Sequence, residues 1–82
     1  MSKLWREPAP IEVEVNGEQP AAVHVNGQRH QVQAIETRWR VDERWRGGPA
    51  RDYFLVVTDR GMWGIVYQDL VSQAWFLQGI YD

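Results

Sequence analysis

One segment of the chain, residues 37–54, concentrates the side chains that could bind a ligand. A guanidinium group beside an indole ring can stack on the ring, and it can hold a carboxylate or a phosphate through paired hydrogen bonds. A Gly-Gly-Pro sequence at residues 47–49 interrupts the segment. The segment is therefore the first candidate for a binding surface. Its arginines and tryptophans are Arg38, Arg40, Arg44, Arg46, Arg51, Trp39 and Trp45.

Two kinds of side chain alternate between residues 38 and 46. Four of the arginines, with Asp42 among them, occupy the even positions, and the odd positions carry Trp39, Val41, Glu43 and Trp45. In a strand, alternate residues share one face and lie about 6.5–7 Å apart. We therefore predict a strand over Trp39–Trp45, with a row of arginines facing solvent and Trp39 in the core behind it. Trp45, next to the Gly-Gly-Pro loop, is the best candidate for an exposed ring.

The arginine row has two interpretations. It can be a structural ladder of ion pairs and cation–π contacts, because Asp42 lies within the row and Glu12 and Glu14 face outward on another strand. It can instead be a surface for an anion, such as a nucleic-acid backbone, with bases stacking on the neighbouring rings. The net charge of the whole chain, −2, does not decide between the two interpretations. Residues 37–51 are locally basic despite it, because they hold five arginines and only two carboxylates.

Most of the remaining chain has the alternation or the apolar composition of short strands. Ile11–Val15 alternates strictly, and the Asn-Gly pairs at residues 16–17 and 26–27 favour tight hairpin turns. Ile35 falls out of phase with the strand before it, which predicts a β-bulge near residues 33–35. The expected strands are Ile11–Val15, Ala21–Val25, Gln28–Ile35, Trp39–Trp45, Tyr53–Thr58, Met62–Tyr67 and Trp75–Tyr81.

About seven short strands in 82 residues are too small a set for a two-layer sandwich of ordinary size. Gly64 and Gly79 interrupt two of the strands, as tight curvature requires. We therefore predict an all-β fold, a small and strongly curved antiparallel barrel or half-barrel of six to seven strands. Residues 1–9 are expected to form an extended arm, with Trp5 docked on the barrel or frayed from it. Residues 10–82 are expected to form the single domain.

Composition narrows the classes of function. The chain has no cysteine, so it has neither disulfides nor thiolate metal sites, and it suits a reducing cytoplasm. The N-terminal residues lack the apolar stretch of a signal peptide. His24 and His30 lie on opposite faces in the expected register, so they cannot share a metal ion. No histidine adjoins Ser2 or Ser72 in the pattern, and no Gly-rich phosphate loop precedes a helix. We expect no enzyme activity, no metal and no cofactor.

Four motifs of aromatic and charged residues occur between residues 39 and 82: Trp39-Arg-Val-Asp-Glu-Arg-Trp-Arg46, Arg51-Asp-Tyr-Phe54, Tyr67-Gln-Asp-Leu70 and Trp75-Phe-Leu-Gln-Gly-Ile-Tyr-Asp82. They resemble those of a family of small, uncharacterised bacterial all-β domains, and the similarity covers residues 10–82. The second half, residues 45–82, is also similar to the C-terminal tail of the inactive Y-family-polymerase-like subunit of the bacterial mutasome. The resemblance implies an accessory or protein-binding role near DNA-damage tolerance, and it brings no catalytic residues.

We therefore expect a non-catalytic binding or adaptor module, and two modes of binding are open. In the first, another protein or a second copy of the chain contacts an exposed sheet edge or an aromatic patch. Ile11–Val15 is the edge expected to support self-association. In the second, single-stranded nucleic acid binds the basic face of Arg38–Arg51 and stacks on Trp45. The two modes differ in salt response, because phosphate contacts weaken steeply as the salt concentration rises.

Overall fold

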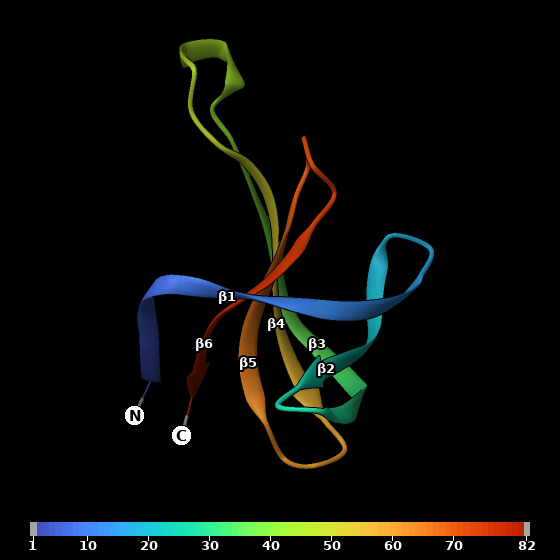
Figure 1. Cartoon of the computed structure of the whole chain (residues 1–82). Coiled ribbons are helices and arrows are strands. Elements are labelled where there is room, and N and C mark those ends of the chain that lie inside the picture. The colour runs from blue at the N-terminus through green and yellow to red at the C-terminus, as the bar shows by residue number, and fades with distance from the viewer. Residues whose placement is uncertain (1, 82) are drawn as a thin grey trace.

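The computed structural model describes the backbone of residues 2–81 and the side chains of residues 7–81. Six antiparallel strands follow one another in sequence order around a closed barrel (Figure 1). The predicted all-β, strongly curved antiparallel barrel is confirmed. The elements are β1 (Ser2–Asn16), β2 (Gln19–Val25), β3 (Gln28–Asp42), the 3-10 helix η1 (Arg44–Arg46), β4 (Ala50–Thr58), β5 (Trp63–Asp69) and β6 (Trp75–Tyr81).

Tight turns join the first three strands, as the Asn-Gly pairs predict. Asn26 and Gly27 have φ angles of 52° and 76°, and positive values at both central residues are what a type I′ hairpin requires. The turn between β1 and β2 is centred one residue later than its Asn-Gly pair predicts. The reason is that Asn16 still pairs with Gln19 at the end of the ladder.

The core is a cluster of five side chains from β2, β4, β5 and β6, each at most 1% exposed. Fully burying an aliphatic or aromatic side chain of this size contributes about 1.5–3 kcal/mol to folding. β4 supplies two members of the cluster and alternates between buried and half-buried residues along its whole length. The residues of β3 and β5 that pair with buried residues of β4 therefore face the core. The cluster consists of Val23, Phe54, Val56, Val66 and Leu77.

β1 closes the barrel by pairing with two strands in succession. Its first part pairs with β6 through Ser2–Leu4 and Ala9–Ile11, and its second part pairs with β2 through Glu12–Asn16. The segment expected as an arm therefore contributes its backbone to a strand, while the side chain of Trp5 lies outside the described residues. Because Ile11–Val15 is held within these two ladders, it is not the edge strand of an open sheet.

The hairpin of β3 and β4 is the most prominent feature of the outline, because its yellow-green end projects away from the other strands (Figure 1). The bulge predicted near residues 33–35 is present between Val32 and Ala34, and a second one lies between Ile35 and Thr37. The predicted strand over Trp39–Trp45 is wrong in its second half. β3 ends at Asp42, and the next residues turn through η1.

Candidate functional site

The register between β3 and β4 decides which face of β3 points inward. Arg38 lies directly opposite Phe54 in the ladder. Arg40 lies directly opposite Asp52, and both of these β4 residues are buried. Since directly paired residues of an antiparallel ladder share a face, the two arginines belong to the inward face and Trp39 belongs to the outer face. The expectation of Trp39 in the core is therefore wrong, because Trp39 is 37% exposed. The arginines lie on the opposite face from the one expected, yet the side chains of Arg38 and Arg40 are still 37% and 55% exposed.

Asp52 is the centre of an ion-pair cluster on this inward face. Arg40 donates to both carboxylate oxygens of Asp52, from Nε at 2.6 Å and from Nη2 at 2.9 Å. A second guanidinium nitrogen, Nη2 of Arg38, lies 3.7 Å from Oδ2 of Asp52. The hydrogen bonds from Arg40 hold the pKa of Asp52 below its usual range, even though burial acts in the opposite direction. The carboxylate is therefore charged at neutral pH and fixed by the arginine opposite it.

The tip of the β3–β4 hairpin is closed by its own backbone. The Glu43 N–H donates to the carbonyl of Pro49 at 2.7 Å, and the Gly48 N–H donates to the carbonyl of Glu43 at 2.8 Å. Gly47 has a φ of 77°, the left-handed conformation in which glycine is favoured. These bonds form the turn that begins at Glu43, so β3 ends at Asp42, three residues earlier than the Arg–Trp alternation predicts.

Both arginines of η1 pair with carboxylates at the same tip. Arg44 donates to the two oxygens of Asp42 at 3.0 and 2.6 Å, and Arg46 donates to Glu43. The guanidinium carbon of Arg46 lies 5.4 Å from the ring centroid of Trp45. Trp45 is 80% exposed, in agreement with its selection as the exposed ring.

Four aromatic side chains form a row across the outer face, one from each of β3 to β6. They are cross-strand partners, and consecutive ring centroids lie 5.2, 5.1 and 5.1 Å apart. Arg51 joins this row, since its guanidinium carbon lies 4.6 Å from the centroid of Tyr67 and its Nη1 donates to the hydroxyl of Tyr53 at 3.2 Å. The order of the row is Trp39, Tyr53, Tyr67 and Phe76.

All five arginines of the candidate set are therefore engaged within the protein. Arg40, Arg44 and Arg46 donate to carboxylates, Arg51 stacks on a tyrosine, and Arg38 lies over an aromatic ring within ion-pair distance of two carboxylates. The contacts of Arg38 and Arg40 cross from β3 to β4, as the ladder interpretation predicts. The pairs of Arg44 and Arg46 lie within the hairpin tip, and Glu12 and Glu14 take no part. Glu14 instead accepts hydrogen bonds from Arg29 and pairs with His24.

A groove between β2 and β3 was not predicted from the sequence. β2 pairs with β3 only through Ala22–Val25 and Gln28–Gln31. Beyond this ladder the two strands separate, because Gln19 and Pro20 remain paired with β1 and β3 remains paired with β4. Within the described residues, the β2-facing edge of β3 therefore has no strand neighbour from Val32 onward.

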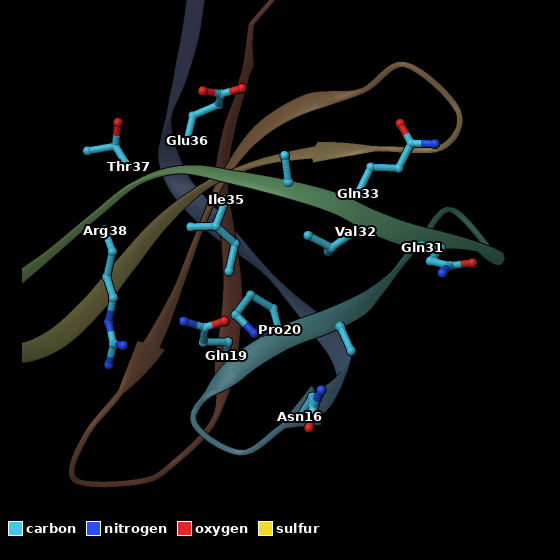
Figure 2. Close-up of a pocket in the computed structure, with 12 residues that line it drawn as sticks. Asn16, Gln19, Pro20, Gln31, Val32, Gln33, Ile35, Glu36, Thr37 and Arg38 are labelled. Carbon is cyan, nitrogen blue, oxygen red and sulfur yellow. The ribbon is translucent and has the colours of Figure 1, made fainter.

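The space between the separated strands is an open groove of about 680 Å³. In Figure 2, Ile35 of β3 and Pro20 of β2 lie between the two ribbons, and Gln19 lies beside Pro20. Val32 and Ile35 also pack against the core cluster, so the floor of the groove is apolar. Arg38 stands at the end of the lined stretch of β3 and extends toward Gln19 (Figure 2).

The sequence contained one signal for this groove. No glycine or proline interrupts residues 28–42, whereas β2 is bounded by Pro20 and by an Asn-Gly turn. A 15-residue strand paired with a 7-residue strand must leave part of its edge uncovered. The expectation of a break between separate strands at Gln28–Ile35 and Trp39–Trp45 concealed this mismatch.

The two histidines lie on opposite faces, as predicted. His24 is beside Glu14, with 2.9 Å between Nε2 and Oε2, while His30 is buried next to Thr58. Over the described part of the chain, no three histidine or acidic side chains gather as a metal site would require. Nor does a helix in that part have the length and apolar character needed to span a membrane.

Comparison with known proteins adds no relative, since the chain matches no family model, no curated protein and no solved structure.

Proposed function

We propose that this chain is a non-catalytic binding module that captures an extended segment of a partner protein in the groove between β2 and β3. The observation that carries the proposal is the free edge of β3, from Val32 onward, beside a groove of about 680 Å³. A free strand edge presents main-chain donors and acceptors that an incoming strand can pair with, and pockets beside it accept alternate side chains. The cytoplasm is the setting that we propose.

The dimensions suit a short peptide. The stretch of β3 that lines the groove runs from Gln31 to Arg38. Its part that is not paired with β2, from Val32 to Arg38, spans roughly 20 Å in an extended chain. The floor offers an apolar surface at Val32 and Ile35, and the rim is made of glutamines and other polar residues. An added strand would therefore place apolar side chains on the floor and leave polar side chains at the rim.

The two bulges in β3 make this edge selective. An exposed, regular edge pairs with any strand, and natural proteins reduce this hazard with bulges and charged side chains. Here the bulges lie at Val32–Ala34 and Ile35–Thr37, and Glu36 and Arg38 lie along the same stretch. A partner must match an irregular register, which favours one class of segment over indiscriminate association. The resemblance to the mutasome subunit makes proteins of DNA-damage tolerance the first partners to test.

The test is selection from a displayed library of random eight-residue peptides, followed by NMR mapping of the best binder. Strand addition is expected to slow amide exchange in Val32–Arg38 and to shift the resonances of Gln19–Ala21. Ala34→Arg is expected to abolish binding, because it places a long charged side chain on the free edge of β3, and such side chains block strand addition. Val71→Arg, in the β5–β6 turn where Val71 is 73% exposed, is the control that adds the same charge elsewhere. Selected peptides that protect no β3 amide, or a library that yields none, would refute the proposal.

Single-stranded nucleic acid remains the second candidate, and the exposure of Trp45 beside Arg46 at the hairpin tip is the observation that favours it. Both tip arginines are paired with carboxylates, so a phosphate would have to replace an existing partner. A titration of Trp fluorescence with an oligonucleotide decides the matter. Binding at low salt that weakens on Trp45→Ala and on raising the salt concentration supports this candidate, and a flat titration removes it.

A further inference from the structure

Arg38 differs from the other arginines of the hairpin in how it is held. Its guanidinium carbon lies 5.2 Å from the centroid of the Phe54 ring. Nη2 lies 3.7 Å from Oδ2 of Asp52 and 3.8 Å from Oε2 of Glu18. Both of these distances are longer than a hydrogen bond. The ring therefore fixes the guanidinium in position, and Nη2 lies beyond hydrogen-bond distance of both carboxylates.

Neither neighbouring carboxylate is a strong partner for Arg38. Both oxygens of Asp52 already accept hydrogen bonds from Arg40 at 2.6 and 2.9 Å. The Glu18 side chain is 85% exposed, and exposed ion pairs contribute little to stability. Glu18 lies in the turn between β1 and β2, immediately before the β2 residues that line the groove. Its carboxylate can move away without disturbing a strand.

Arg38 also lies at one end of the groove, where it extends toward Gln19 (Figure 2). Guanidinium is planar and binds a carboxylate through two parallel hydrogen bonds, which gives geometric selectivity as well as affinity. A carboxylate carried by a peptide in the groove would meet this group at the end of the paired segment.

We propose that Arg38 is a carboxylate clamp for the partner segment, and that Glu18 occupies it in the free protein as a weak internal competitor. The inference rests on the proposed function and specifies its ligand: an extended peptide with an apolar residue for the floor near Ile35 and a carboxylate at the Arg38 end. That carboxylate is either an acidic side chain or the free C-terminus of the partner.

The two residues have opposite predicted effects on affinity, which a purely structural role would not produce. Removing the clamp with Arg38→Gln is expected to weaken binding about tenfold, the loss of a charge-assisted hydrogen-bonded pair. Removing the competitor with Glu18→Gln is expected to tighten binding about two- to fivefold, because the peptide no longer displaces an ion pair. Arg44→Gln makes the same change in charge at the hairpin tip and is expected to leave affinity unchanged.

The experiment is calorimetric titration of the four proteins with the best peptide from the library selection and with two altered forms of it. In one form each acidic residue is replaced by its amide, and in the other the C-terminus is amidated. Weakening by the first change identifies a side-chain carboxylate, and weakening by the second identifies a terminal one. Arg38→Gln is expected to abolish the difference between the sensitive form and its parent.

The inference fails if Arg38→Gln and Glu18→Gln change affinity in the same direction, or if neither changes it. It also fails if neither altered peptide binds more weakly than its parent. In each case, loss of binding on Ala34→Arg would leave the groove, and with it the proposed function, standing. If Ala34→Arg has no effect either, both proposals fall together.

Discussion

Asp52→Asn tests the energetic centre of the hairpin. The substitution keeps the shape of the side chain but removes its charge. Arg40 donates to both carboxylate oxygens, at 2.6 and 2.9 Å. In asparagine one of these oxygens remains as an acceptor, and the other is replaced by an amide nitrogen whose hydrogens face the donors of Arg40. Arg38, whose Nη2 lies 3.7 Å from the same carboxylate, loses a counter-charge as well.

The magnitude follows from burial and from the number of bonds. Hydrogen bonds to charged groups contribute about 1.5–3 kcal/mol each when buried. Asp52 has a side chain only 7% exposed, but that of Arg40 is 55% exposed, so water compensates part of the loss. We therefore expect the free energy of unfolding to fall by about 2–3 kcal/mol, a total close to one such bond. For a domain of this size that lowers Tm by roughly 10–20 °C.

The pH dependence has a definite sign. Arg40 lowers the pKa of Asp52 in the folded state, whereas the unfolded chain has the ordinary value near 3.9. The stabilisation by Asp52 is therefore fully present above that value and is lost as the pH falls through the lower pKa of the folded state. The difference in stability between wild type and Asp52→Asn should persist from pH 7 to pH 5 and shrink below pH 4.

Urea denaturation followed by circular dichroism measures this difference at each pH. Asp42→Asn is the matched control, because Asp42 also binds an arginine but has a side chain 36% exposed. An exposed pair contributes much less to stability than a buried one. The reasoning is refuted if the two substitutions cost the same at pH 7, or if the cost of Asp52→Asn is undiminished at pH 2.

Two further predictions concern the barrel side wall and the hairpin tip. The hydrogen bonds from Arg29 and His24 lower the pKa of Glu14 to about 2, so its contribution to stability is present above its unfolded pKa and is lost as the pH falls through about 2. NMR titration of the Glu14 side chain should show this value and a return toward 4.5 in Arg29→Gln. At the tip, a Cβ on Gly48 would lie 2.7 Å from Cβ of Glu43, so Gly48→Ala should speed amide exchange at Glu43 while the core amides stay protected. Gly47→Ala, where no atom lies within 4 Å, should show only the smaller cost of its left-handed backbone; equal effects of the two changes would contradict the steric argument.

Local patterns predicted most of the strands, because each short-range signal has a local physical cause. Alternation placed Ile11–Val15 in β1, and the Asn26–Gly27 pair marked a hairpin whose central residues both have positive φ. The apolar run at Tyr53–Thr58 became most of β4, the strand that contributes most to the core. These features depend on residues that are neighbours in the chain, so the sequence alone carries the information.

Features that depend on pairing between distant residues were not predictable in the same way. The groove exists because Gln19 and Pro20 stay with β1 while β3 stays with β4, a choice between strand partners that no local pattern records. The early end of β3 depends on hydrogen bonds between Glu43 and the residues at the far side of the loop. The Arg–Trp alternation continues through this point, so alternation alone overestimated the strand.

In the second half of β3, the inward and outward residues are the reverse of those predicted, and the second bulge is the cause. A bulge adds one residue to a strand and therefore exchanges its two faces from that point on. With only the predicted bulge near residues 33–35, Trp39 would point inward. The second bulge, between Ile35 and Thr37, exchanges the faces again and turns Arg38 inward, directly opposite Phe54. The same irregularity thus places an aromatic ring on the outer surface and a guanidinium group at the end of the groove. A deletion of Glu36 that removes this bulge should reverse both placements, or unfold the barrel if the Asp52 ion pairs are indispensable.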